Sequence, residues 1–202
     1  MNFLTTKRPK GKVYFSKSEF ESRGFPKKPT TLESYLLANL MYYILNPIRI
    51  KIGMPIMLTD CYRSMAKYRD LKKRGYYPSP TSDHFWAQVI PTTRSRDVKK
   101  FGPQYHFSAG AVDFVCPRAG SLVGTFNVIR DLVNKNIIDV GQCILETKYE
   151  IKNGKKKMLK QWIHISNPKS LIYTGGFIKD MGIQKTKFLT SDDNGKTYKV
   201  VL

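Results

Sequence analysis

The clearest structural signal in this chain lies in residues 142–166, QCILETKYEIKNGKKKMLKQWIHIS. Two strand-like runs, 142–151 and 156–166, flank the dipeptide Asn153-Gly154. Asn-Gly between two such runs is the strongest short-range predictor of a two-residue hairpin turn. We therefore expect an antiparallel hairpin whose second strand ends near Ser166.

The end of this second strand alternates between apolar and polar residues. Side chains of a strand point alternately to its two faces. If Ile163 and Ile165 enter the core, Trp162, His164 and Ser166 share the opposite face. The pattern predicts that His164 projects from a rigid strand.

The remaining periodicity predicts an α+β fold, a small antiparallel sheet covered by helices. A capping-box pattern at Thr30 and Glu33 precedes the expected first helix. Residues 75–110 are rich in Pro, Ser, Thr and Gly and predict a long irregular excursion. The expected helices are 31–51, 65–74 and 121–135, and the expected strands outside the hairpin are 55–59 and 111–115.

The chain divides into three expected parts. Residues 1–29 form a Lys-rich, Pro-containing basic arm, and residues 30–170 form the main domain. Residues 171–202 form a C-terminal extension, in which we expect a hairpin that turns at residues 193–195.

Composition limits the partners. Thirty-five Lys and Arg against fifteen Asp and Glu give a net charge of +20, which attracts polyanions such as an anionic cell-wall polymer or nucleic acid. No apolar run approaches the roughly 18 residues of a membrane span, and we find no signal peptide. The expected location is the cytoplasm until release. The three cysteines, an odd number outside any C-x-x-C pair, are expected to stay reduced.

A metal site is predicted from histidine and aspartate spacing. His106 and Asp113 are seven residues apart with small residues between them, so a loop can bring both side chains to one point. His164 supplies a second imidazole from the hairpin. Two imidazoles, one carboxylate and a water are a normal ligand set for catalytic zinc. Taken singly, each histidine is more simply an ordinary polar residue.

These residues resemble the zinc D-alanyl-D-alanine carboxypeptidases, dipeptidases and phage L-alanyl-D-glutamate endopeptidases, which share a hedgehog-like fold. The family pattern runs S-G-Y-R-S, then S-x-H-x-x-G-x-A-x-D, then W-x-H-x-S. This chain has residues 60–64 (DCYRS), 110–113 (GAVD) and 162–166 (WIHIS) in that order. The resemblance covers about residues 30–166. It implies a zinc peptidase of bacterial peptidoglycan, of endolysin or carboxypeptidase type, phage-encoded or virion-associated.

The resemblance leaves the first metal ligand open between two histidines. The S-x-H element appears as Ser82-Asp83-His84, 29 residues before Asp113. Either an insertion has split the motif and His84 binds the metal, or His106 binds it. Spacing favours His106, which leaves His84, with Ser82 and Asp83, facing the substrate.

The position of the glutamate that serves as general base varies within the family. Some members have Glu three residues before the last His, but this chain has Gln161, which cannot accept a proton from water. Other members have it at the end of the preceding strand, which is Glu146 here. A simple turn pairs Glu146 with Gln161 on the wrong face, whereas one bulge pairs it with Trp162 on the face of His164. The alternative is that Glu146 and Glu150 are solvated strand charges.

The resemblance also implies roles for residues around the metal. Arg63 matches the arginine that contacts the substrate or the developing oxyanion. Tyr62, Ser64 and Trp162 are expected to contact substrate. The rival interpretations are a non-catalytic module of this fold that binds cell wall or nucleic acid through its basic surface, and a phage structural or DNA-associated protein.

Overall fold

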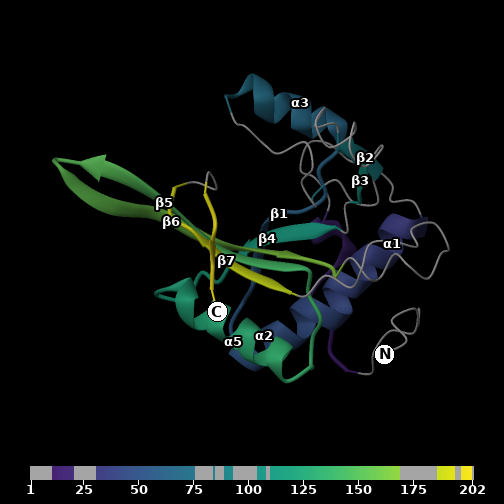
Figure 1. The fold of residues 1–202 in the computed structure, drawn as a ribbon. Helices are drawn as coiled ribbons and strands as arrows, with labels where there is room; N and C mark the ends of the chain where they lie inside the picture. Colours follow the sequence, from purple (N-terminus) through teal and green to yellow (C-terminus); the bar gives the residue numbers. More distant parts are fainter. Residues whose placement is uncertain are drawn as a thin grey trace.

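The computed structural model describes residues 11–20, 31–75, 84, 89–92, 104–107, 110–168, 186–193 and 197–201. Within these residues, one six-stranded sheet has the strand order β1-β4-β6-β5-β7-β8 (Figure 1). Its strands are β1 Met57–Asp60, β4 Ala111–Val115, β5 Gln142–Lys152, β6 Lys155–Ser166, β7 Lys187–Ser191 and β8 Lys199–Val200.

The expected mixture of helices with a mostly antiparallel sheet is confirmed, with one departure. Strand β7 pairs with β5 in the parallel direction, and the other neighbouring strands of the sheet pair antiparallel. Parallel neighbours need a connection of about a dozen residues or more. Residues 167–186 provide that length between the end of β6 and the start of β7.

The β5–β6 hairpin has the predicted turn. Asn153 and Gly154 have φ values of 51° and 71°, the left-handed conformation of a type I′ turn. The hairpin extends well beyond the rest of the sheet (Figure 1). Its register changes where Lys148 pairs with Lys160 but Tyr149 pairs with Met158, so Leu159 is the extra residue of a bulge.

The predicted helix over 31–51 is present as one helical run from Thr31 to Ile52. It consists of α1 Thr31–Ala38, the π-helical segment η2 Asn39–Leu45 and α2 Asn46–Ile52. Pro47 lies in the first turn of α2 and cannot donate to the preceding turn. In the wider π turn before it, the Asn46 N–H donates to the Met41 carbonyl. The helix therefore continues through Pro47 without a break.

The hydrophobic core lies between one face of the sheet and the helices. Ile163 and Ile165 are 0% exposed, as the alternation predicts, and α2 and α5 (Leu122–Asn134) lie together on their side of the sheet (Figure 1). The core is also formed by Leu40, Ile44, Leu45, Ile48, Val112, Phe114 and Ile129. The opposite face carries Asp113 on β4, Glu146 on β5 and His164 on β6.

Described segments near the N-terminus and the C-terminus pack with the main domain. In the predicted basic arm, Phe15 and Phe20 pack into the core, and Lys17–Phe20 forms the short 3-10 helix η1. In the predicted C-terminal extension, β7 and β8 pair antiparallel and join the main sheet, while the turn expected at residues 193–195 lies partly outside the described residues.

The segment before β4 differs in part from its prediction. Helix α3, Met65–Lys73, confirms the expected basic helix. The excursion 75–110 was predicted to be irregular, but β2 Val89–Thr92 and β3 Gln104–Phe107 pair as a two-stranded antiparallel sheet. Proline and glycine content does not exclude such a pair, because two short strands need only four residues each.

Candidate metal centre

Three side chains from distant parts of the chain meet on the polar face of the sheet. Asp113 on β4 is paired directly with His164 on β6. His84 reaches the same point from the segment before β2. One ligand atom from each of the three residues lies within 4.8 Å of the other two. This group can hold a metal ion.

The distances fit a small tetrahedral ion. His84 Nε2 lies 3.2 Å, and His164 Nδ1 2.9 Å, from the same oxygen of Asp113, Oδ1. Metal bonds of about 2.0–2.2 Å in tetrahedral geometry place neighbouring ligand atoms ~3.3 Å apart. The two imidazole rings cross at 66° with centroids 5.1 Å apart. Both nitrogens and the carboxylate oxygen lie close enough together to bind one metal ion.

The tautomer of His84 is set by its second nitrogen. His84 Nδ1 lies 2.7 Å from the Cys61 carbonyl oxygen. Because a carbonyl oxygen only accepts, Nδ1 carries the proton and donates. Nε2, which faces Asp113 Oδ1, is then the nitrogen that is positioned to bind a metal, and the carbonyl fixes the ring orientation.

Asp113 is held as a carboxylate. Burial pushes its pKa upward, but the charge of His84 and the hydrogen bonds from both imidazoles outweigh burial and hold the pKa well below its usual range. The ionised form of the carboxylate is the form that binds a metal.

The structure thus places His84 beside Asp113 and His164. The segment between His84 and Asp113 contains β2 and β3. His106 lies on β3, where its backbone pairs with Ile90. Its side chain lies outside the described ones, so the spacing-based preference for His106 stays a prediction. Ser82 and Asp83 also lie outside the described residues.

Glu146 lies beside the metal centre on the same face. The bulge at Leu159 pairs it with Trp162, the register that places both side chains on the face of His164. Burial, and then the charge of Asp113, raise its pKa above the ordinary value. The Trp162 side chain donates a hydrogen bond to the carboxylate. Glu150, the alternative carboxylate, pairs with Lys157 beyond the bulge.

The Gln161 side chain lies on the core side of the sheet and links β6 to α5. Its side-chain oxygen accepts from the Leu122 N–H at 2.8 Å, and its nitrogen donates to Thr147 Oγ1 at 3.1 Å. The amide thus caps the first turn of α5 and links it to β5. A residue here faces the core, away from His164.

Arg63 is buried next to the centre and is tied to Asp60, a residue that the sequence interpretation missed. Its Nη2 lies 2.7 Å from Asp60 Oδ2, and Lys67 contacts the other carboxylate oxygen. The Arg63 N–H also donates to the His84 carbonyl at 2.8 Å. Asp60 pairs with Asp113 across β1 and β4. Its position at the start of the DCYRS element was the available signal.

The other predicted substrate-contact residues have different surroundings. Tyr62 is buried in the core cluster. Ser64 caps α3, where its hydroxyl accepts from the Lys67 N–H at 3.1 Å. Trp162 is half-buried, with Lys160 Nζ 4.9 Å from its ring centroid. Of these three, Trp162 lies on the face of the metal centre.

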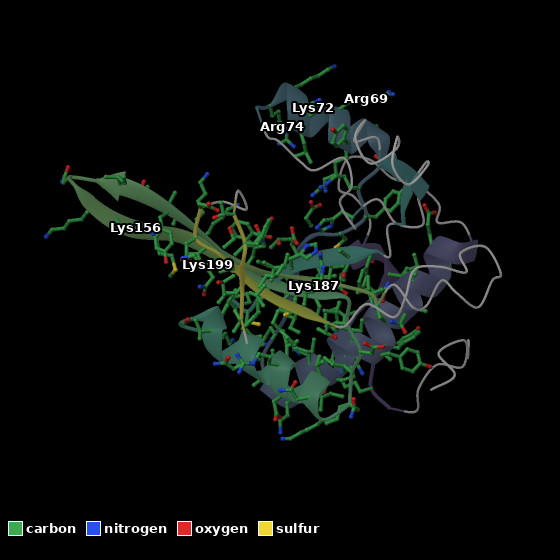
Figure 2. The ribbon with its side chains drawn as sticks, viewed as in Figure 1. Arg69, Lys72, Arg74, Lys156, Lys187 and Lys199 are labelled. Carbon is green, nitrogen blue, oxygen red and sulfur yellow. The ribbon has the colours of Figure 1, made fainter. Side chains whose placement is uncertain are left out.

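Basic residues lie on α3 and on the projecting hairpin. Figure 2 shows Arg69 and Lys72 on α3, Arg74 directly after it, and Lys156 on the extended part of the β5–β6 hairpin. The hairpin part, residues 148–160, also carries exposed Lys152, Lys155, Lys157 and Lys160. The three cysteines are free and buried, in agreement with the expected reduced state.

Comparison of the chain with protein-family models, curated proteins and solved structures finds no match. In the part of the chain that the structure describes, no helix has the length and apolarity needed to cross a membrane. What the fold and the centre define is a mixed α/β protein with a buried His-Asp-His group suited to a metal ion.

Proposed function

We propose that this chain is a zinc-dependent peptidase that hydrolyses peptide bonds of bacterial peptidoglycan. One observation carries the proposal: His84, Asp113 and His164 converge on one point, and Glu146 lies on the same face of the sheet. A three-residue ligand set with a carboxylate beside it is typical of hydrolytic zinc sites.

The donor atoms favour zinc. Two imidazole nitrogens and one carboxylate oxygen form a common ligand set of catalytic zinc, with the fourth position left for water or substrate. When bound, zinc lowers the pKa of a coordinated water and polarises the peptide carbonyl. His84, Asp113 and His164 would hold it.

The chain's own residues supply the proton transfers. Glu146 accepts a proton from the attacking water and then delivers it to the leaving amine. Its raised pKa suits both steps, because a base that is too weak accepts the proton poorly. The Trp162 hydrogen bond orients the carboxylate. Arg63, buried and fixed by Asp60, provides positive charge for the oxyanion that develops on the carbonyl.

The substrate class rests on the motif resemblance. The DCYRS, GAVD and WIHIS elements are the residues that carry it, and each contributes a residue to this centre: Arg63, Asp113 and His164. The hedgehog-like peptidase fold, and an endolysin or carboxypeptidase role in a phage or virion, are part of the same proposal.

The test is hydrolysis by the zinc-loaded protein. Purified peptidoglycan and its isolated stem peptides are offered, and new amino groups are measured. We expect their release by wild type and not by the zinc-stripped protein. Failure of the zinc-loaded protein to release amino groups from any of these substrates would refute the peptidase proposal.

A second candidate is a binding module for an anionic cell-wall polymer or nucleic acid. The exposed lysines on residues 148–160 favour it, because this part of the β5–β6 hairpin projects beyond the rest of the sheet, as Figure 2 shows around Lys156. We expect salt-sensitive retention of wild type on the polymer, reduced when Lys155, Lys156 and Lys157 are changed to Gln. Such binding with no hydrolysis would replace the peptidase proposal by this one.

A further inference from the structure

The C-terminal hairpin continues the row of residues that contains Glu146. Strand β6 pairs Trp162 with Glu146, and β7 pairs Ser191 with Glu146. Strand β8 pairs Lys199 with Thr190 in the antiparallel direction, so one step further along the register Tyr198 lies beside Ser191. Side chains in one cross-strand row share a face. Tyr198 thus lies on the face of the metal centre.

The carboxylate of Asp193 links the end of β7 to the residue that precedes Tyr198. Asp193 Oδ1 accepts from Ser191 Oγ and from the Thr197 N–H, each at 2.9 Å. The Thr197 hydroxyl also donates to Asp193. Residues on both sides of the loop are therefore tied to the same side chain, and Tyr198 follows directly.

The surroundings of Tyr198 agree with this placement. Burial raises its pKa to about 12, with further contributions from the charges of Glu146, Asp113 and Asp193. Its hydroxyl is therefore within electrostatic reach of the metal centre and stays protonated. The side chain is still 48% exposed. It is a hydrogen-bond donor that a ligand on this face can reach.

The strand order places groups on both sides of Glu146. Asp60 lies at the β1 edge of the sheet, in the neighbouring row that contains Asp113 and His164, and it holds Arg63 there. Tyr198 lies at the β8 edge, beyond Glu146. In the proposed mechanism Glu146 delivers its proton to the leaving amine. The half of the substrate that carries the leaving amine then lies on the Tyr198 side of Glu146. The other half lies on the Arg63 side.

We infer that Tyr198 is a substrate-binding residue whose hydroxyl donates a hydrogen bond to a carbonyl or carboxylate oxygen on the leaving-amine half of the peptide. The inference rests on the proposed peptidase function. It assigns the C-terminal hairpin a role in binding that half of the substrate.

The test compares Tyr198→Phe with wild type on a stem peptide that wild type hydrolyses. Tyr149→Phe is the matched control, because Tyr149 lies on the projecting hairpin beyond the bulge, with Lys156 above its ring. Zinc content and circular dichroism check the fold of each variant. We expect Tyr198→Phe to raise KM about 3- to 10-fold, the effect of losing one neutral hydrogen bond, with kcat within twofold and zinc unchanged.

An unchanged KM for Tyr198→Phe, with zinc bound, would overturn the inference and leave the peptidase proposal intact. A fall in kcat without a change in KM would also overturn it, because positioning by uniform binding acts on KM. If wild type releases no amino groups from any peptide, the peptidase proposal fails and this inference fails with it.

Discussion

Glu146 lies directly opposite Trp162 because Leu159 of the β5–β6 hairpin is bulged out of the ladder. If Leu159 were instead paired in a regular ladder, the two-residue turn at Asn153-Gly154 would pair Glu146 with Gln161, and the carboxylate would face the core. The position of the proposed base is therefore a matter of strand register.

Deletion of Leu159 is expected to preserve this register. The turn still pairs Tyr149 with Met158, and Lys160 then follows Met158 directly, so Glu146 stays opposite Trp162 in a regular ladder. We expect zinc content like that of wild type and hydrolysis within about threefold, measured on the same stem peptide. A variant that folds and binds zinc but hydrolyses at less than a tenth of the wild-type rate would contradict the register argument.

The Glu146→Gln variant is expected to bind zinc but to lose hydrolysis by about 10²-fold or more, because the base acts on the water and is not a ligand. Glu150→Gln is the matched control, since Glu150 lies on the same strand beyond the bulge. The measurements are zinc per chain and kcat. Turnover by Glu146→Gln within a few-fold of wild type, or a large loss in Glu150→Gln, would make Glu150 the base.

A glutamate at position 161 is not expected to replace Glu146. Gln161 faces α5 and caps the Leu122 N–H, so Gln161→Glu places a carboxylate on the core side of the sheet. The double variant Glu146→Gln, Gln161→Glu should remain as inactive as Glu146→Gln alone. Recovery of more than a tenth of wild-type activity would show that position 161 reaches the centre.

Asp60 is expected to stabilise the metal-free protein in a pH-dependent way. Burial tends to raise its pKa, but the charges of His84, Arg63 and Lys67 outweigh burial and lower it. A lowered pKa means that the carboxylate contributes stability above the unfolded-state value of 3.8 and loses it as pH falls through the folded-state pKa. Urea unfolding should show Asp60→Asn about 1–3 kcal/mol less stable at pH 7.

The difference between Asp60→Asn and wild type should shrink as pH falls below 3.8. Asp131→Asn is the control, because its ion pair with Lys135 is exposed and contributes little. A difference that stays constant from pH 7 to pH 3 would mean that the Asp60 charge is not the stabilising feature.

The sequence predicted the elements whose patterns are local. The alternation around Ile163 and His164, the Asn153-Gly154 turn and the helical spacing over 31–51 each depend on neighbouring residues, and the structure confirms all three. Glu146 was placed only conditionally, because a bulge has no local sequence signature. The structure contains that bulge.

Longer-range relationships were harder to predict. The preference for His106 assumes that ligands seven residues apart come from one loop, and it stays a prediction because the His106 side chain lies outside the described ones. The position of His84, 29 residues before Asp113 in the sequence but beside it in the structure, is a long-range relationship that spacing does not predict. The parallel pairing of β7 with β5, and with it the place of Tyr198, depends on a connection of about 20 residues that no periodicity describes. Gln161 was assessed as a missing base, but its cap on α5 becomes visible only once β6 and α5 are packed.

The identity of the histidine that binds the metal together with Asp113 and His164 defines the centre. Elemental analysis of wild type, His84→Ala, His164→Ala and His106→Ala, each refolded with added zinc, decides this directly. We predict about one zinc per chain in wild type and His106→Ala, and near zero in His84→Ala and His164→Ala, because a site that loses one of three ligands binds weakly. Zinc retained by His84→Ala and lost by His106→Ala would contradict the centre described here, and equal, near-zero zinc in all four proteins would contradict the metal site itself.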